Sequence, residues 1–185
     1  MALEAPSCVR SYRRSQVIGA THVAAKSDHD QAGPAGKAVR GLMMSQLCQH
    51  RRLARVITYE WRGLFGNAAL NALHAEGFGH RVLEDDWWAQ VNQHSLGWAC
   101  AREGRDLAGF VNVAWDGGVH AFVLDTLVTA RGRGQGAGTR LVAIATENAR
   151  AAGCEWLHVD FEDDLRPFYL GSCGFRPTNA GLIAL

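Results

Sequence analysis

Residues 128–142 read Val-Thr-Ala-Arg-Gly-Arg-Gly-Gln-Gly-Ala-Gly-Thr-Arg-Leu-Val. This glycine-rich stretch lies between an expected strand that ends at Val128 and a segment whose apolar residues have helical spacing. Glycines let the backbone approach a ligand closely, and the first N–H groups of a helix have no partner within the helix. A loop of this kind before a helix favours anion binding, and a pyrophosphate fits it.

Two registers of an Arg-x-x-Gly-x-Gly pattern fit the loop, one starting at Arg131 and the other at Arg133. The second register places Leu141 and Val142 on the helix face that must pack against the sheet, whereas the first places two polar residues there. We therefore choose the second register. Its signature positions are Arg133, Gly136 and Gly138.

Other nucleotide-binding loops match this stretch less well. A Walker loop requires Lys followed by Ser or Thr after its last glycine, and Ala137-Gly138-Thr139 follows Gly136 here. A Rossmann fingerprint would accept Gly132 and Gly134, but it belongs after an opening parallel strand rather than after an antiparallel meander. A mobile loop without a ligand also remains an alternative for so short a pattern.

The chain before the loop predicts a strand, two helices and three further strands. Residues 57–61 alternate as a half-buried strand does, and residues 67–74 form a helix that we expect Gly77 to end. The acidic residues 84–86 favour a second helix start, because carboxylates complement the helix dipole there. Short connections then join strands into an antiparallel meander. These strands are residues 97–102, 107–115 and 119–128.

The chain after the loop predicts one parallel crossover. A helix over residues 136–152 stops at Gly153 and leads into a strand over residues 154–161. A last helix over residues 164–173 and a terminal strand over residues 175–185 complete the chain. The prediction is therefore an α+β fold with a mixed, mostly antiparallel sheet in the order β-α-α-β-β-β-α-β-α-β.

Length and composition indicate one globular domain with a tail. The chain has 185 residues, of which 48% are hydrophobic and 20% charged, and it has no apolar run of the roughly 20 residues that a membrane span requires. Residues 1–55 show no sustained periodicity of apolar residues, and they contain Gly33-Pro34-Ala35-Gly36, a cluster that interrupts regular secondary structure. We expect them to form a disordered or weakly helical extension, and residues 56–185 to form the functional domain.

Charge and cysteine usage narrow the class of protein. Residues 1–56 carry a formal net charge of +6, and the rest of the chain carries −5. The domain therefore lacks the basic surface of a dedicated nucleic-acid binder. The five cysteines have no paired spacing and follow no leader segment. We therefore expect no disulfide framework, no metal site and a cytoplasmic location.

The loop and a second motif together resemble the GNAT superfamily of acetyl-coenzyme-A-dependent N-acetyltransferases. Residues 133–138 look like its Arg/Gln-x-x-Gly-x-Gly/Ala pyrophosphate motif. Downstream, Phe168-Tyr169 and then Cys173-Gly174-Phe175 resemble the family's "FY…GF" ending. The resemblance covers about residues 58–185 by element order, and it is most specific from Phe122 onward.

The resemblance implies acetyl-CoA as co-substrate and direct transfer of its acetyl group to a primary amine, without a covalent enzyme intermediate or a metal. It also implies that Tyr169 protonates the leaving thiolate, and a phenol suits this role because it stays protonated at neutral pH. A packed tyrosine that seals the last helix is the structural alternative. The implied donor-binding residues are Leu127, Val128, Arg133, Gly134, Gln135, Gly136, Ala137, Gly138 and Thr139.

The base that deprotonates the amine is poorly determined by the sequence. Asp125 and Asp160 lie near the ends of the two strands that flank the crossover, so both are candidate catalytic residues, with ordered water as a competitor. Glu162 stands where many relatives carry an asparagine that contacts the coenzyme. A carboxylate beside phosphates would be unfavourable, so this departure puts that contact in doubt.

The acceptor and the oligomeric state are left open. Acceptor pockets are built by variable loops, so small-molecule amines and peptide amines are both expected partners, without nucleic acid or membrane. A non-catalytic acyl-CoA sensor on the same scaffold is the main alternative function. Nucleic-acid binding through Arg131, Arg133 and the basic extension ranks third. The terminal strand and an exposed sheet edge also favour a homodimer.

Overall fold

The computed structural model describes residues 56–184. The sequence-based prediction for residues 1–55 lies outside these residues. Within residues 56–184, no helix has the length and apolar character needed to cross a membrane.

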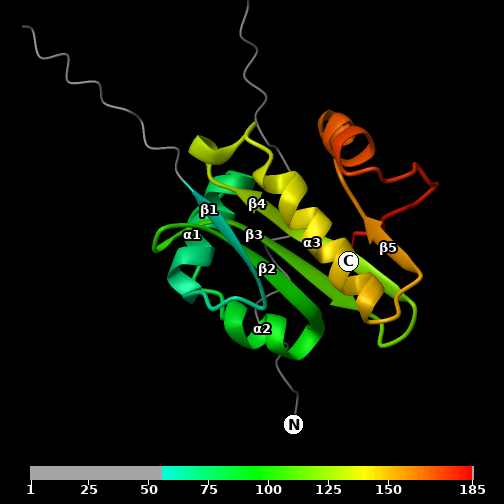
Figure 1. Cartoon of the computed structure of the whole chain (residues 1–185), viewed down its shortest axis with the longest axis horizontal. Coiled ribbons are helices and arrows are strands. Elements are labelled where there is room, and N and C mark those ends of the chain that lie inside the picture. The colour runs from blue at the N-terminus through cyan, green and yellow to red at the C-terminus, as the bar shows by residue number, and fades with distance from the viewer. Residues whose placement is uncertain (1–55, 185) are drawn as a thin grey trace, which may run out of the picture. The chain divides into compact units, whose positions relative to one another are not determined.

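A five-stranded sheet forms the centre of the fold (Figure 1). Its strands lie in chain order, with β1 to β4 antiparallel and β5 parallel to β4. The predicted meander and the single parallel crossover are therefore confirmed. The strands are β1 (Ile57–Trp61), β2 (Ser95–Glu103), β3 (Asp106–Trp115), β4 (His120–Val128) and β5 (Trp156–Val159).

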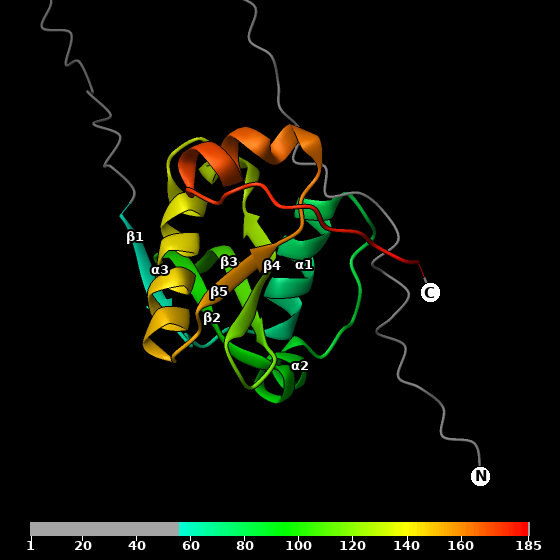
Figure 2. The same ribbon diagram turned by 90° about the vertical axis from the view of Figure 1, so that its right-hand side faces the viewer.

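Helices cover both faces of this sheet, α1 (Asn67–Phe78) and α2 (Trp87–His94) on one face and α3 (Ala137–Ala151) on the other (Figure 2). Alternation along β3 divides the core between the two faces. Val111 packs towards α3 with Leu141, and its neighbour Phe110 packs towards α1 and α2. All three side chains are fully buried. The hydrophobic effect therefore fixes both layers against β3, the neighbour of the strand that leads to the site.

Helix α1 extends beyond the residue at which the sequence predicted its end. Gly77 lies inside the helix, and Gly79, with φ 68°, forms the left-handed cap whose N–H donates to Ala75 O at 2.9 Å. A Cβ at Gly77 would lie 2.5 Å from Leu127 Cδ2. This glycine therefore serves the close packing of α1 on β4 instead of ending the helix.

The C-terminal part differs from the prediction in two ways. The single helix expected over residues 164–173 is a 3-10 turn, η3 (Asp163–Leu165), followed by a π-helical segment, η4 (Pro167–Ser172). The strand expected over residues 175–185 is wrong for the residues described, because residues 174–184 contain none. Residues 176–184 are exposed, and Pro177 has no backbone N–H that could donate a hydrogen bond to a neighbouring strand. Without a neighbouring strand, alternation alone does not create one.

Candidate functional site

A pocket of about 350 Å³ opens where β4 ends and α3 begins. Helix α1 contributes Gly77 and Phe78 to its wall, β4 contributes residues 126–128, and the C-terminal segment contributes Leu165, Phe168, Tyr169 and Ser172. The glycine-rich loop and the first turn of α3 form the remaining wall. Their lining residues are Gly132, Arg133, Gly134, Gly136, Ala137, Gly138 and Thr139.

The loop turns back on itself before α3 through two glycines with positive φ. Gly134 has φ 71° and Gly136 has φ 81°, a region in which residues with a Cβ are strained. Gly136 is the N-cap of α3, and no side chain caps this end. The N–H groups of the first helical turn therefore point to the pocket mouth without intrahelical partners, a geometry suited to a phosphate.

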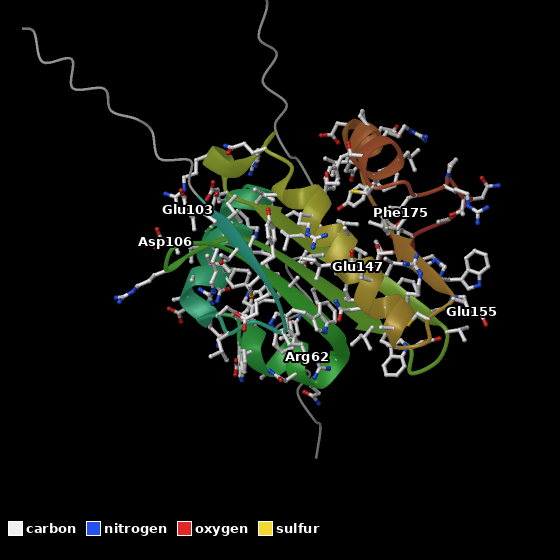
Figure 3. The ribbon with its side chains drawn as sticks, in the orientation of Figure 1. Arg62, Glu103, Asp106, Glu147, Glu155 and Phe175 are labelled. Atoms are coloured by element: carbon white, nitrogen blue, oxygen red, sulfur yellow. The ribbon has the colours of Figure 1, made fainter. Side chains whose placement is uncertain are left out.

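The two loop arginines have different surroundings. Arg133 lines the pocket, and its Nε donates to Val128 O at 3.2 Å. Arg131 instead lies beside the carboxylates of Glu103 and Asp106, which face each other at the β2–β3 turn (Figure 3). Gln135 is exposed, donates to Arg131 O at 2.7 Å and is absent from the pocket wall. The loop thus presents one guanidinium to the pocket and holds the other away.

Gly138 permits the close packing of α3 against the C-terminal segment. A Cβ at this position would lie 3.1 Å from Phe168 Cζ and 3.6 Å from Val128 Cγ2. Both neighbours line the pocket, as Gly138 itself does. Any larger side chain here would push into the space between β4 and η4.

A β-bulge interrupts β4 beside the pocket. Phe110 pairs with Leu127 and Asn112 pairs with Leu124, so Asp125 and Thr126 together face one residue of β3. Asp125 has φ 51°, an uncommon conformation for a residue with a side chain. Thr126 Oγ1 is buried and has no hydrogen-bond partner within residues 56–184. Buried hydroxyls are normally satisfied, and the polar group that lies near this one is the Tyr169 phenol.

These features fit the chemical groups of coenzyme A. The backbone N–H groups at the start of α3 and the Arg133 side chain are groups that could hold a pyrophosphate. The apolar wall at Leu127 and Phe168 suits an alkyl arm. In the part of the chain that the structure describes, no cluster of three or more His, Cys, Asp or Glu residues could hold a metal ion.

Tyr169 is a buried part of the pocket wall. It is 4% exposed, and its ring stacks on Phe161 with centroids 4.9 Å apart. Burial raises the pKa of the Tyr169 phenol above its usual range; the nearby Thr126 hydroxyl lowers it in part, although this contact falls short of a full hydrogen bond. The negative charge of Asp125 adds to the rise. The phenol is therefore held in its protonated, proton-donating form at neutral pH.

The two candidate aspartates have different surroundings. Asp125 lies on the bulge next to Thr126, and Asn112 Nδ2 donates to its Oδ2 at 3.4 Å. Neither aspartate is part of the pocket wall, and Asp160 is exposed and follows the end of β5. Glu162 is also exposed and precedes η3 as its N-cap residue. Asp125 is therefore the better placed of the two aspartates.

One residue near the site escaped the sequence reasoning. His74 on α1 lies with its Nε2 3.6 Å from Asp125 Oδ1, and its ring contacts Phe78 of the pocket wall with centroids 4.4 Å apart. Helical periodicity places His74 on the same face as Phe78, one turn away. Helical periodicity alone does not connect His74 with Asp125, because this contact forms only when α1 packs on β4.

Comparison with solved structures finds the same fold in proteins of low sequence identity. A GNAT family acetyltransferase from Streptococcus pneumoniae is 22% identical, with a TM-score of 0.59 over 70% of this chain and 98% of its own. Glucosamine-6-phosphate N-acetyltransferase from Arabidopsis thaliana is 16% identical, with a TM-score of 0.57 over 69% of this chain and 98% of its own. AAC(6')-Iy, in complex with the bisubstrate analogue CoA-S-monomethyl-acetylneamine, is 16% identical, with a TM-score of 0.56 over 70% of this chain and 97% of its own.

Comparison at the level of sequence gives the family. No curated protein matches the chain significantly. The sequence model of the Acetyltransferase (GNAT) family matches residues 58–175. This range includes the glycine-rich loop, Tyr169 and all five strands, except for the first residue of β1. The chain therefore belongs to the GNAT acetyltransferase family.

Proposed function

We propose that this protein transfers the acetyl group of acetyl-CoA directly to a primary amine. The observation that carries the proposal is the continuity of one pocket from the glycine-rich loop to the Tyr169 side chain. An anion-binding end and a proton donor at the other end are what a bound acyl thioester of this kind requires. Membership in the family supports the same donor.

The donor would be held by groups of β4, the loop and α3. Arg133 and the N–H groups at the start of α3 would bind the pyrophosphate, and the backbone of Leu127 and Val128 would accompany the pantetheine arm. Gly134, Ala137, Gly138 and Thr139 would shape the wall. Gln135 faces away from this wall, so we assign it the support of the loop through Arg131 O instead of a ligand contact.

Bound acetyl-CoA would supply an acetyl group activated as a thioester. Tyr169 would give its phenolic proton to the sulfur as the C–S bond breaks and the new N–C bond forms. The bulge residue Asp125 would face the side from which the amine approaches, next to Thr126. Its carboxylate would take up the proton that the amine loses, and Asp160 is too exposed for us to retain it in this role.

A combined binding and turnover experiment tests this function. Calorimetric titration of the full chain with acetyl-CoA should give saturable binding, and a thiol-release assay with a panel of primary amines should give turnover. Binding without turnover on any amine would favour the non-catalytic acyl-CoA sensor. Absence of binding to the folded protein would contradict both functions.

The acceptor class follows only in outline. Two structures with the same fold are a glucosamine-6-phosphate N-acetyltransferase and an enzyme bound to an acetylneamine-based analogue. We therefore propose that the acceptor is a small-molecule or peptide amine. The amine panel should include amino sugars, aminoglycosides, polyamines and peptides. Steeply salt-dependent binding to DNA or RNA would be the result that favours a nucleic-acid partner instead.

We also propose that the protein forms a homodimer in the cytoplasm. Strand β5 is an edge of the sheet, with no second strand beside it among residues 56–184. The side chains of Phe122 and Trp156 near this edge are 42% and 50% exposed. A second copy would cover them and complete the edge. Sedimentation velocity at micromolar concentration tests the dimer, and cell fractionation tests the location.

A further inference from the structure

Three polar side chains connect the β4 bulge to the segment after α1. His74 Nε2 lies 3.6 Å from Asp125 Oδ1, and His74 Nδ1 lies 2.7 Å from His80 Nε2. His80 Nδ1 in turn lies 2.6 Å from the backbone oxygen of Arg81. The last two distances are those of hydrogen bonds, whereas the first exceeds the length of a hydrogen bond.

The contacts of this series determine where the imidazole protons lie. A carbonyl oxygen only accepts, so His80 must donate from Nδ1 to Arg81 O, and its Nε2 in the neutral ring is then an acceptor. His74 must therefore donate from Nδ1 to His80. This leaves Nε2 of His74 as an unprotonated lone pair that faces the Asp125 carboxylate.

The opposite arrangement would place two acceptors against each other. If His74 donated from Nε2 to Asp125, its Nδ1 would need a proton from His80 Nε2. Neutral His80 would then point an unprotonated Nδ1 at the Arg81 oxygen across 2.6 Å. Contact of two lone pairs across 2.6 Å is far less favourable than the 3.6 Å separation that the first arrangement leaves between the His74 Nε2 lone pair and Asp125 Oδ1, so the first arrangement holds for neutral rings.

The carboxylate is fixed from its other side as well. Asn112 Nδ2 donates to Asp125 Oδ2 at 3.4 Å, and Ser95 Oγ donates to Asn112 Oδ1 at 2.6 Å. The hydroxyl of Ser95 thus orients the amide of Asn112 with its NH₂ group towards Asp125. Asn112 is 3% exposed. This buried support leaves Oδ1 of Asp125 to face His74.

The pair lies beside the acetyl end of the proposed donor site. Asp125 precedes Thr126 of the pocket wall, and His74 packs on Phe78 of the same wall. The Asp125 charge also reaches Tyr169, because it contributes to the raised pKa of the phenol. The side chains of His74 and Asp125 are 12% and 17% exposed. A partly buried proton acceptor therefore stands next to the proton donor of the pocket.

We propose that His74 and Asp125 act together as the general base, with His80 as the positioning residue that fixes the tautomer of His74. The inference rests on the proposed transfer to an amine and assigns it a further catalytic residue. One proton leaves the amine nitrogen, passes to the Asp125 carboxylate and comes to rest on Nε2 of His74. The product is an imidazolium beside a carboxylate, and the proton returns to water after the acetylated amine departs.

The surroundings of His74 suit this role. The titratable groups in contact with the ring are Asp125 from β4 and His80 from the segment after α1. Phe78 and Trp87 pack on the ring with centroids 4.4 and 5.0 Å away. The apolar rings limit access of water, and Asp125 provides the counter-charge of the imidazolium.

A side-chain ¹⁵N–¹H correlation spectrum of the full chain tests the tautomers without any substrate. His74 and His80 should both appear protonated at Nδ1 when the rings are neutral. Assignment comes from the His74→Gln and His80→Gln variants, each of which removes one set of signals. An Nε2-protonated His74 would overturn the proposal, because that nitrogen could not accept a proton.

The kinetic arm compares His74→Gln with the control His94→Gln, a residue exposed at the end of α2. The His74→Gln variant should lose at least about tenfold in kcat with unchanged acetyl-CoA affinity, and its acid limb in the pH profile should disappear. His80→Gln should keep most activity, since its amide oxygen accepts from His74, whereas His80→Phe should not.

The two arms separate failure of this assignment from failure of the proposed function. If the wild type transfers acetyl groups and His74→Gln does so equally fast, the base assignment is wrong and the function stands. If the wild type binds acetyl-CoA but acetylates no amine of the panel, the proposed function fails, and the role of His74 fails with it.

Discussion

Arg131 forms an ion pair with Glu103, whose Oε2 lies 3.4 Å from the Arg131 Nε. A second carboxylate, that of Asp106, lies 3.6 Å from the same guanidinium. These ion pairs hold Arg131 at the turn between β2 and β3, whereas Arg133, two residues later, lines the pocket. Two arginines that look equivalent in the sequence therefore differ in the ligand they can reach.

Substitution of the two arginines should separate these roles. We expect Arg133→Ala to lose about 1.5–3 kcal/mol of acetyl-CoA binding, a roughly 10- to 150-fold rise in Kd, because a charge-assisted contact to phosphate is removed. Arg131→Ala should change Kd less than about threefold, since its side chain is half exposed and such pairs contribute little. Calorimetry measures both, and a larger effect at Arg131 would reverse the chosen register.

Gly138 should tolerate no large side chain. A Cβ there already approaches Phe168 Cζ to 3.1 Å, so Gly138→Leu should fill the pocket and abolish acetyl-CoA binding. Gly66→Ala is the control, because a Cβ at Gly66 meets nothing within 4 Å. Thermal unfolding with and without acetyl-CoA reports this, since only a binding-competent protein is stabilised by the ligand. A ligand-induced rise in Tm for Gly138→Leu would contradict the packing argument.

Tyr169→Phe should reduce kcat by about 100-fold or more while acetyl-CoA affinity stays unchanged, because the ring packing remains and only the proton donor is lost. Tyr59→Phe on β1 is the matched control and should retain activity. In the wild type, the raised pKa of Tyr169 keeps the phenol protonated below that pKa. On the basic side of the pH profile, the rate should therefore fall only as pH rises above about 10.

A basic limb centred well below this range would assign the titration to another group. Retained kcat in Tyr169→Phe would make Tyr169 a packing residue, the alternative that its ring contacts with Phe161 and Phe168 allow. Stopped-flow measurement of thiol release between pH 6 and about 11 distinguishes these outcomes.

Asn71 should be a main determinant of stability on the α1 and α2 side. Its Nδ2 donates to Asp85 O at 2.9 Å, and its Oδ1 accepts from Trp87 Nε1 at 3.1 Å. Asn71→Ala should lower the free energy of unfolding by about 2 kcal/mol, because buried partners are left unsatisfied. Urea denaturation measures this. Asn92→Ala, which removes an exposed bond to Trp88 O, should cost far less.

Residues with a local signal were the ones that the sequence placed well. Asp86 caps α2 through the bond from Ala89 N to its Oδ1, as expected for an acidic residue at a helix start. The hairpin at Asp116 forms because its carboxylate accepts from Gly118 N at 2.7 Å. Gly77 was read wrongly, since its role depends on Leu127, a residue far away in the chain.

The sequence by itself determined the order of the elements from β1 to β5 and the glycine-rich loop before α3, and the family resemblance that this loop carries implied the donor. Periodicity, turn residues and helix ends depend on neighbours in the chain, so they can be read without a structure. The roles that the sequence assigns to individual site residues stay predictions. They include Arg133 at the pyrophosphate and Tyr169 as the acid.

Only the tertiary structure decided which side chains meet. The contact of His74 with Asp125 arises where α1 packs on the β4 bulge, and Asp160 is exposed because it follows the end of β5. The missing C-terminal strand has the same origin, because a strand requires a partner. Packing couples residues that are distant in the chain, and local patterns carry no information about such distances.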